Sequence, residues 1–168
     1  GADALLRGRD VVFERARLSL PGTHNALNAC AALATLEAAG EDAVAAATHL
    51  ATFKPLPHRL QALGRRDGLA WIDDSIATTP QAALEALRSV DAARTWLLLG
   101  GHDRGLDWRP FAEAMQALPP KAIVASGANA ARIAATLDAS GSSACRFERV
   151  ATLADAVALV RAEAAPGD

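Results

Sequence analysis

The chain has 168 residues, of which 51% are hydrophobic and 21% charged, a balance typical of a folded globular domain. The formal net charge of -2 argues against a dedicated nucleic-acid or membrane-surface binder, which normally carries a basic stripe. No apolar run reaches the roughly 18 residues of a transmembrane helix, and no secretory pattern opens the chain, so we expect a cytoplasmic protein. Cys30 and Cys145 lie in apolar sequence without ligand spacing, which predicts reduced, buried side chains.

Residues 1–52 show one predicted strand followed by two predicted helices. Residues 11–20 alternate apolar and polar side chains, which predicts a strand. Ala/Leu-rich segments without internal glycine or proline predict helices over residues 24–39 and 41–51. A single strand cannot bury a face of both helices. We therefore expect residues 1–52 to be the tail of a domain whose body lies outside this chain.

The remainder predicts a stiff linker and then an α/β domain. Two prolines make residues 53–59 a linker, and from residue 60 short apolar runs alternate with helical segments. This alternation predicts a Rossmann-like, mostly parallel sheet with flanking helices. The strands are expected at 69–72, 95–99, 122–125 and 147–150, and the helices at 80–89, 110–118, 128–138 and 153–164. The helix stop and turn at 164–168 usually lead into another strand, so we expect the domain to be truncated.

The loop after the first of these strands is rich in polar side chains. Residues 73–80 read Asp-Asp-Ser-Ile-Ala-Thr-Thr-Pro, and ligands of open parallel sheets bind just beyond the carboxyl ends of strands. Carboxylates there can bind ribose hydroxyls or a metal, and hydroxyls with helix amides suit an anion. The structural alternative is that Thr79 caps the next helix, with Pro80 in its first turn, while the aspartates are solvated turn residues.

The loop after the next strand is rich in glycine. Residues 100–107 carry three glycines, which permit close backbone approach, and Arg104, whose fork can bind a carboxylate or phosphate. The spacing is not that of the dinucleotide fingerprint, and a glycine-rich turn with a solvated arginine is a common alternative.

Two smaller clusters precede these loops. Asn25 and Asn28 lie near a predicted helix start, where they can contact an adenine edge, although capping by Asn25 is the structural alternative. Arg59 follows His58 in the linker and could reach phosphates. The sequence contains no phosphate loop of the form G-x-x-x-x-G-K-[ST] and no nucleophile elbow, so it carries no complete catalytic motif.

Taken in order, these four clusters resemble the Mur ligases, in particular those that add glutamate to UDP-N-acetylmuramoyl-L-alanine. The matching runs are Gly22–Ala32, Phe53 to Leu60, the Asp-Asp-Ser-Ile-Ala-Thr loop and Leu97–Asp107, and the resemblance covers roughly residues 11–165. Four motifs in the same order are more specific than any one of them.

The resemblance implies an ATP- and Mg²⁺-dependent ligase of three domains that acts through an acyl phosphate in peptidoglycan precursor synthesis. Residues 1–52 would end its central ATPase domain, 53–59 would be the linker, and 60–168 would be the glutamate domain. By resemblance Asn25 and Asn28 would face adenine, Arg59 the phosphates or ribose, and Asp74 the ribose. Thr78 and Arg104 would hold glutamate, while the metal site and the UDP-substrate site would lie largely outside this chain, which alone would be inactive.

Departures from the family pattern in two loops bear on the amino acid. In the first loop Asp73, Ile76 and Thr79 stand where the family carries asparagine, lysine and asparagine, and in the glycine-rich loop Arg104 stands where the family carries lysine. A planar fork replaces a point donor, so glutamate would sit differently, and L-glutamate becomes a possible substrate in place of D-glutamate. Two alternatives remain, a ligase that adds glutamates to folate and a stand-alone nucleotide-binding α/β module.

Overall fold

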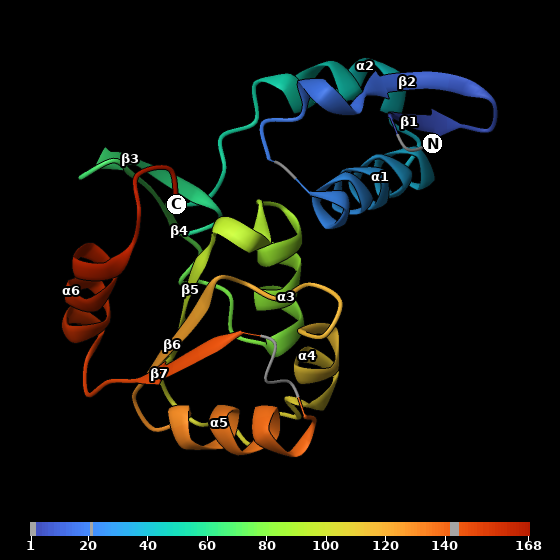
Figure 1. Ribbon diagram of the computed structural model, residues 1–168. Coiled ribbons are helices and arrows are strands. Elements are labelled where there is room, and N and C mark those ends of the chain that lie inside the picture. Colours follow the sequence, from blue (N-terminus) through green and yellow to red (C-terminus); the bar gives the residue numbers. More distant parts are fainter. Residues whose placement is uncertain (1–2, 21, 142–144) are drawn as a thin grey trace. The chain divides into compact units, whose positions relative to one another are not determined.

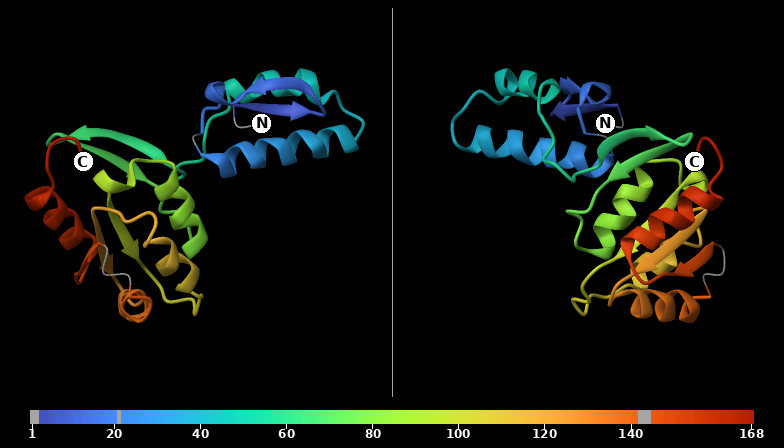
Figure 2. Two further views of the ribbon diagram at one scale, coloured as in Figure 1. Left: turned by 45° about the vertical axis from the view of Figure 1, so that its right-hand side comes forward. Right: turned by 90° about the vertical axis from the view of Figure 1, so that its left-hand side faces the viewer.

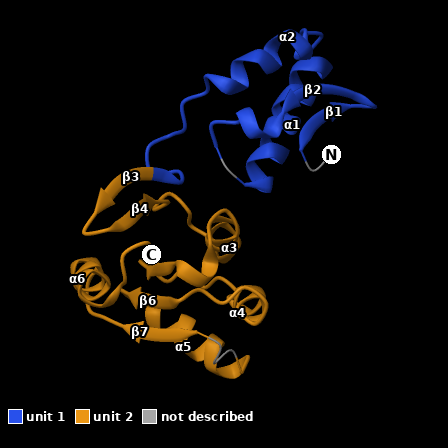
Figure 3. Ribbon diagram, turned by 45° about the horizontal axis from the view of Figure 1, so that its top comes forward, with its two compact units in different colours: residues 1–61 blue, residues 62–168 orange. Residues whose placement is uncertain are grey.

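The computed structural model describes residues 3–20, 22–141 and 145–168, and the chain divides into two compact units, Gly1–Gln61 and Ala62–Asp168 (Figure 3). No helix in the described ranges is both long and apolar enough to cross a membrane.

The first unit is a β-hairpin packed with two helices. Strands β1 (Ala4–Arg7) and β2 (Asp10–Glu14) pair antiparallel, and α1 (Thr23–Ala38) runs beneath the hairpin in both views of Figure 2. The helix α2 (Ala43–Ala47) starts at Asp42, whose side chain accepts hydrogen bonds from two backbone amides. The buried core of this unit consists of Leu5, Phe13, Ala29 and Ala47.

The structure corrects two expectations for this unit. The strand expected over residues 11–20 ends at Glu14, the last residue in register with β1, and a 3-10 helix, Arg15–Arg17, follows, closed by a hydrogen bond from the Leu18 amide to the Arg15 carbonyl. The cysteine expectation is wrong for Cys30, which is exposed, while Cys145 is half-buried. Cys30 follows the buried Ala29, and one helical step of about 100° turns it away from the core.

The second unit begins with a hairpin that the sequence pattern did not reveal. Strands β3 (Gln61–Arg66) and β4 (Leu69–Asp73) are joined by Asp67 and Gly68, which both have positive φ, as a type I′ turn requires. Every residue of β3 is exposed, so the strand lacks the apolar alternation from which a strand is recognised.

The centre of the second unit is a parallel sheet, as the sequence predicted, and its strands lie in the order β5 (Trp96–Gly100), β6 (Ala122–Ser126), β7 (Arg146–Arg149) (Figure 1). Four helices flank it, namely α3 (Pro80–Arg88), α4 (Arg109–Ala114), α5 (Ala130–Ala139) and α6 (Leu153–Glu163). Ile123 packs in the cluster that contains residues of α3, α4 and α5, and the next residue, Val124, packs with residues of α6. This alternation shows that β6 is buried on both faces.

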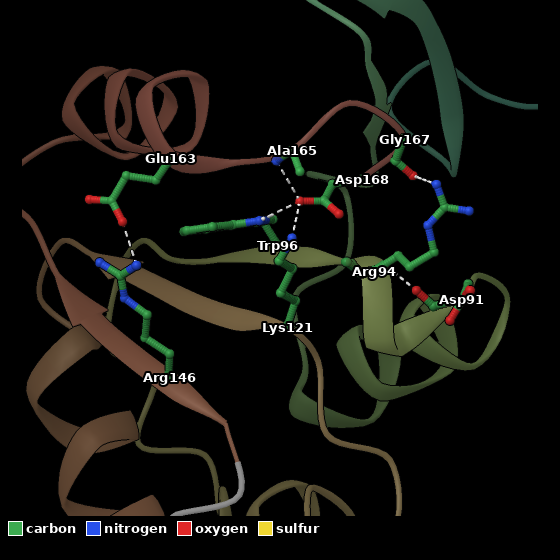
Figure 4. Close-up of polar contacts among 10 residues, drawn as sticks. Asp91, Arg94, Trp96, Lys121, Arg146, Glu163, Ala165, Gly167 and Asp168 are labelled. Atoms are coloured by element: carbon green, nitrogen blue, oxygen red, sulfur yellow. Dashed lines mark hydrogen bonds and ion pairs between the residues drawn. The ribbon is translucent and has the colours of Figure 1, made fainter.

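Strand β4 is not hydrogen-bonded to β5, so the sheet is less continuous than the sequence predicted. Instead, the segment around Asp168 contacts both strands. The Gly167 amide donates to the Gly68 carbonyl, and the Ala70 amide donates to the Asp168 carbonyl. On the other side the carboxylate of Asp168 accepts from Trp96 Nε1 at 3.2 Å and from Lys121 Nζ at 2.5 Å (Figure 4). Residues 167–168 therefore link the hairpin to the parallel sheet.

We expect Asp168→Asn to destabilise the second unit by about 1–3 kcal/mol at neutral pH, because a buried anion that accepts three hydrogen bonds would be lost. Burial acts to raise the pKa of Asp168, but hydrogen bonds from Lys121, Ala165 and Trp96 outweigh it and lower the pKa. The stabilisation is therefore complete above the unfolded-state pKa of about 3.9 and is lost as pH falls through the lower folded-state value.

The measurement is urea unfolding followed by tryptophan fluorescence, which reports on the second unit because all three tryptophans, Trp71, Trp96 and Trp108, lie in it. The exposed Glu113→Gln serves as a control for charge removal alone. A gap between wild type and Asp168→Asn that stays constant from pH 7 to pH 2 would contradict the assigned role of the carboxylate.

Candidate functional site

The loop that follows β4 is shaped by its own polar groups. The Asp73 carboxylate accepts a hydrogen bond from the Ser75 amide at 2.8 Å, and the Ala77 amide donates to the Asp74 carbonyl at 2.8 Å. The Thr79 hydroxyl accepts from the Ala82 amide at 3.1 Å and caps α3. The capping interpretation of Thr79 is thus confirmed, and Asp73 acts in the turn.

The other two candidates in this loop are Asp74 and Thr78, which differ in exposure. Asp74 is half-buried and Thr78 is exposed, and both precede the helix α3, whose first residue, Pro80, is buried. Asp73 and Thr79 therefore shape the loop and the start of α3, and the Thr78 side chain is open to solvent.

The glycine-rich loop starts with an unusually close approach between two backbones. A Cβ on Gly100 would lie 2.1 Å from the Ser126 carbonyl oxygen, and a Cβ on Gly127 would lie 3.0 Å from the Gly101 carbonyl oxygen. The Gly101 amide donates to Ser126 at 3.3 Å, and the Asn129 amide donates to Gly101 at 3.2 Å. The backbones at the ends of β5 and β6 therefore lie in close contact, and this contact, together with the positive φ of Gly100 and Gly127, favours glycine at both of these positions.

The middle of the loop is tied to α5 by an ion pair. Arg132 Nε lies 3.0 and 2.9 Å from the two oxygens of Asp103, and the same carboxylate accepts from the Gly105 amide at 2.8 Å. The hydrogen bonds from Gly105 and Arg132 hold the pKa of Asp103 below its ordinary value, so the carboxylate is charged at neutral pH.

The end of the loop is fixed by burial and by a second arginine. Trp108 is buried and packs edge-on against Phe111, with ring centroids 5.3 Å apart. Asp107 accepts from the Arg109 guanidinium at 2.8 Å and from its amide at 2.9 Å, and the side-chain hydrogen bond is the main reason that the pKa of Asp107 falls to about 2.

Arg104 is the exposed cation of this loop. Among the residues that the structure describes it makes no hydrogen bond or ion pair, whereas both carboxylates of the loop are occupied by other arginines. Because β5, β6 and β7 are parallel, the loops after them leave from one edge of the sheet, where ligands of such folds bind (Figure 1). The arrangement suits recognition of a carboxylate or a phosphate by Arg104.

The first unit holds the other three candidates. Asn25 and Asn28 lie on α1, the first buried and the second exposed, and the half-buried Arg59 lies between two residues of positive φ, His58 and Leu60. The alternative that Asn25 caps the helix is wrong, because α1 begins at Thr23 and its cap residue is Gly22, so Asn25 already lies within the first turn.

Sequence reasoning missed the contribution of the loop after β6. Neither Gly127 nor Arg132 is distinctive in the sequence, because a glycine before a helix and an arginine on a helix surface are both common. The only available signal was the position of Gly127 directly after a strand that neighbours β5. In the described ranges no three His, Cys, Asp or Glu side chains gather as a metal site would require.

Comparison with known proteins decides the family. The model of the Mur ligase, glutamate ligase domain matches residues 58–168. The chain belongs to the Mur ligase family.

Among curated relatives, a UDP-N-acetylmuramoyl-L-alanine--L-glutamate ligase from Xanthomonas euvesicatoria is 51% identical over 80% of this Mur ligase chain and 29% of its own length. One from Xylella fastidiosa is 46% identical over 92% of the chain and 33% of its own length. A UDP-N-acetylmuramoylalanine--D-glutamate ligase from Thiobacillus denitrificans is 37% identical over 99% of the chain and 34% of its own length. The chain thus spans about a third of these relatives.

A solved structure agrees with the fold. MurF from Acinetobacter baumannii superimposes with a TM-score of 0.65 over 86% of this chain and 33% of that one, at 21% identity. The likeness establishes the α/β architecture of the Mur ligase chain.

We expect Gly100→Ala to destabilise the second unit by about 1–3 kcal/mol more than Gly101→Ala does. Both glycines have positive φ, so both variants carry backbone strain, but only the new methyl group at position 100 collides with backbone atoms of β6. Urea unfolding followed by tryptophan fluorescence measures the difference. Equal losses in the two variants would show that β5 and β6 tolerate a wider separation.

Proposed function

We propose that the full-length protein joins glutamate to UDP-N-acetylmuramoyl-L-alanine at the expense of ATP, and that this chain supplies its glutamate-binding domain with the end of its ATPase domain. The observation that carries the proposal is the 51% identity over 80% of the chain to a ligase named for that product. The proposed reaction belongs to the assembly of peptidoglycan precursors and would take place in the cytoplasm.

The proposed domain assignment places residues 1–52 at the end of the ATPase domain, 53–59 in the linker and 60–168 in the glutamate domain. The division of the structure between Gln61 and Ala62 and the start of the family match at residue 58 support a boundary in this region. Because the chain lacks a phosphate loop, we propose that the 168 residues alone carry out no ligation.

We propose L-glutamate as the amino acid. The relatives that are 51% and 46% identical are named for L-glutamate, and the relative named for D-glutamate is 37% identical. Two departures of this chain from the common family pattern, Ile76 and Arg104, fall in the loops proposed to hold the amino acid. A changed ligand shape would be accommodated at such positions.

The proposed chemistry has two steps. ATP transfers its terminal phosphoryl group to the carboxylate of the UDP-substrate, which leaves ADP and an acyl phosphate. The amine of glutamate then attacks the acyl carbon, and phosphate leaves as the amide bond forms. The task of this chain is to place the amine next to the acyl carbon, since correct orientation is a large part of the acceleration of two-substrate reactions.

Each candidate side chain has a role in that placement. Arg104 would bind a carboxylate of glutamate through its free guanidinium, and the exposed Thr78 would donate a hydrogen bond to the same ligand. Asp74 would accept from the ribose hydroxyls of ATP. Asn25 and Asn28 would face the adenine, and Arg59 would approach the phosphates or ribose. We assign no Mg²⁺ ligand to this chain, in whose described residues no three His, Cys, Asp or Glu side chains gather.

We expect Asp74→Ala in the full-length enzyme to weaken ATP use by about 1–3 kcal/mol, the scale of a lost hydrogen bond to a charged group. The measurement is kcat/KM for ATP at saturating glutamate and UDP-substrate. Asp138→Ala, which removes an exposed carboxylate from α5, is the matched control. An unchanged ATP dependence in Asp74→Ala would remove the ribose assignment.

We expect Arg104→Lys to reduce the preference for L- over D-glutamate, because a flexible point donor fixes the direction of a carboxylate less strictly than a planar fork. The ratio of kcat/KM for the two enantiomers, measured before and after the substitution, tests this. If the ratio is identical in the two proteins, position 104 does not set the handedness of the substrate.

A further inference from the structure

The ion pair between Asp103 and Arg132 lies next to Arg104, the residue proposed to bind glutamate. Asp103 precedes Arg104 in the chain, and its two oxygens receive Arg132 Nε at 3.0 and 2.9 Å. It also receives the amide of Gly105, the residue on the other side of Arg104, at 2.8 Å. The Asp103 carboxylate thus joins both chain neighbours of Arg104 to a single helix, α5.

In the described residues the backbone of the loop is bonded to the segment after β6 at its start, where the Gly101 amide donates to the Ser126 carbonyl and the Gly101 carbonyl accepts from the Asn129 amide. Gly101 and Gly105 both have positive φ, and a Cβ at either position would meet no atom within 4 Å. The close contacts of Gly100 with β6 end at the start of the loop, and the burial of Trp108 begins only at its end. Among the described residues, the contact of Asp103 with Arg132 is the hydrogen-bonded link between residues 102–107 and a distant part of the chain.

The pair contributes little to overall stability. The side chains are 46% and 29% exposed, and pairs so open to water are worth about 0–1 kcal/mol of folding free energy. A second pair in the same unit, Arg161 with Asp67, has nearly the same geometry, 2.8 Å with 48% and 44% exposure, but lies on α6 and the β3–β4 hairpin. The two pairs therefore differ in location and not in kind.

We infer that the Asp103–Arg132 pair is a positioning device that holds the backbone around Arg104 so that its guanidinium faces the carboxylate of the incoming amino acid. Arg132 is thus a positioning residue that acts through Asp103. The inference rests on the proposed role of Arg104 in glutamate binding. It predicts that loss of either partner weakens glutamate binding while the ATP site and the fold are left intact.

The test compares Asp103→Ala, Arg132→Ala and the double variant in the full-length enzyme. Each single substitution should raise KM for glutamate about two- to fivefold, the range that an exposed ion pair can supply, with kcat and KM for ATP changed less than about twofold. The double variant should be no worse than Asp103→Ala, because Arg132 acts through Asp103. Arg132→Lys, which keeps the charge, should restore part of the loss.

Arg161→Ala is the matched control and should leave KM for glutamate unchanged, since it breaks an equally exposed pair away from the loop. Thermal unfolding of every variant checks the fold, and Asp103→Asn replaces Asp103→Ala if the latter unfolds. A rise in Arg132→Ala without one in Asp103→Ala would mean that Arg132 binds substrate itself and would overturn the inference. Additive single effects, no effect in either variant, or an equal effect in Arg161→Ala would overturn it as well.

Arg104→Ala separates this inference from the function on which it rests. It should raise KM for glutamate by more than about tenfold, as loss of a charged hydrogen bond does. If Arg104→Ala has this effect and the Asp103 and Arg132 variants have none, the proposed glutamate site stands and the positioning role falls. If Arg104→Ala leaves KM for glutamate unchanged, the proposed role of Arg104 is itself wrong.

Discussion

The close contact between the ends of β5 and β6 is the constraint on which the candidate site depends. A side chain on Gly100 would overlap the Ser126 carbonyl, and one on Gly127 would press on Gly101. Because neither position carries a side chain, the loops after the two strands leave the sheet side by side. The Gly101 amide donates to the Ser126 carbonyl and the Asn129 amide donates to the Gly101 carbonyl, which joins the two loops. The start of α5 is thereby brought to the glycine-rich loop, which allows Arg132 to reach Asp103.

This arrangement also determines the charge that the loop presents. Residues 100–109 contain two aspartates and two arginines, so their sum alone suggests a neutral surface. Arg109 forms a hydrogen-bonded ion pair with Asp107, and Arg132 forms one with Asp103. The lowered pKa of each aspartate keeps both pairs charged at neutral pH. Arg104 has no such partner among the residues that the structure describes, so an anionic ligand can approach its guanidinium without displacing one of them.

The sequence was sufficient for the elements that follow simple patterns. Along the chain, the short apolar runs of the parallel strands alternate with helical segments, so the α/β pattern was predictable. Thr79-Pro80 is a recognisable helix start, which made the beginning of α3 predictable as well. Strand β3 was not, because all its residues are exposed and its existence depends on the turn at Asp67-Gly68. The pairing of Asp103 with Arg132 was not predictable either, since it joins residues 29 positions apart through the geometry of two neighbouring loops.

The exposed cation of the glycine-rich loop is an arginine, Arg104, and this explains why the position of the loop backbone matters. A lysine ammonium is a compact charge on a flexible stem and can meet a carboxylate from many directions. The guanidinium of Arg104 makes its strongest contact only when its plane aligns with that of the carboxylate, so its benefit depends on where the backbone places it. A loop that carries arginine, with glycines of positive φ before and after it, thus has more to gain from a tether than one that carries lysine. The same planarity makes the direction of the bound carboxylate definite, and definite direction is what discrimination between two enantiomers of glutamate requires.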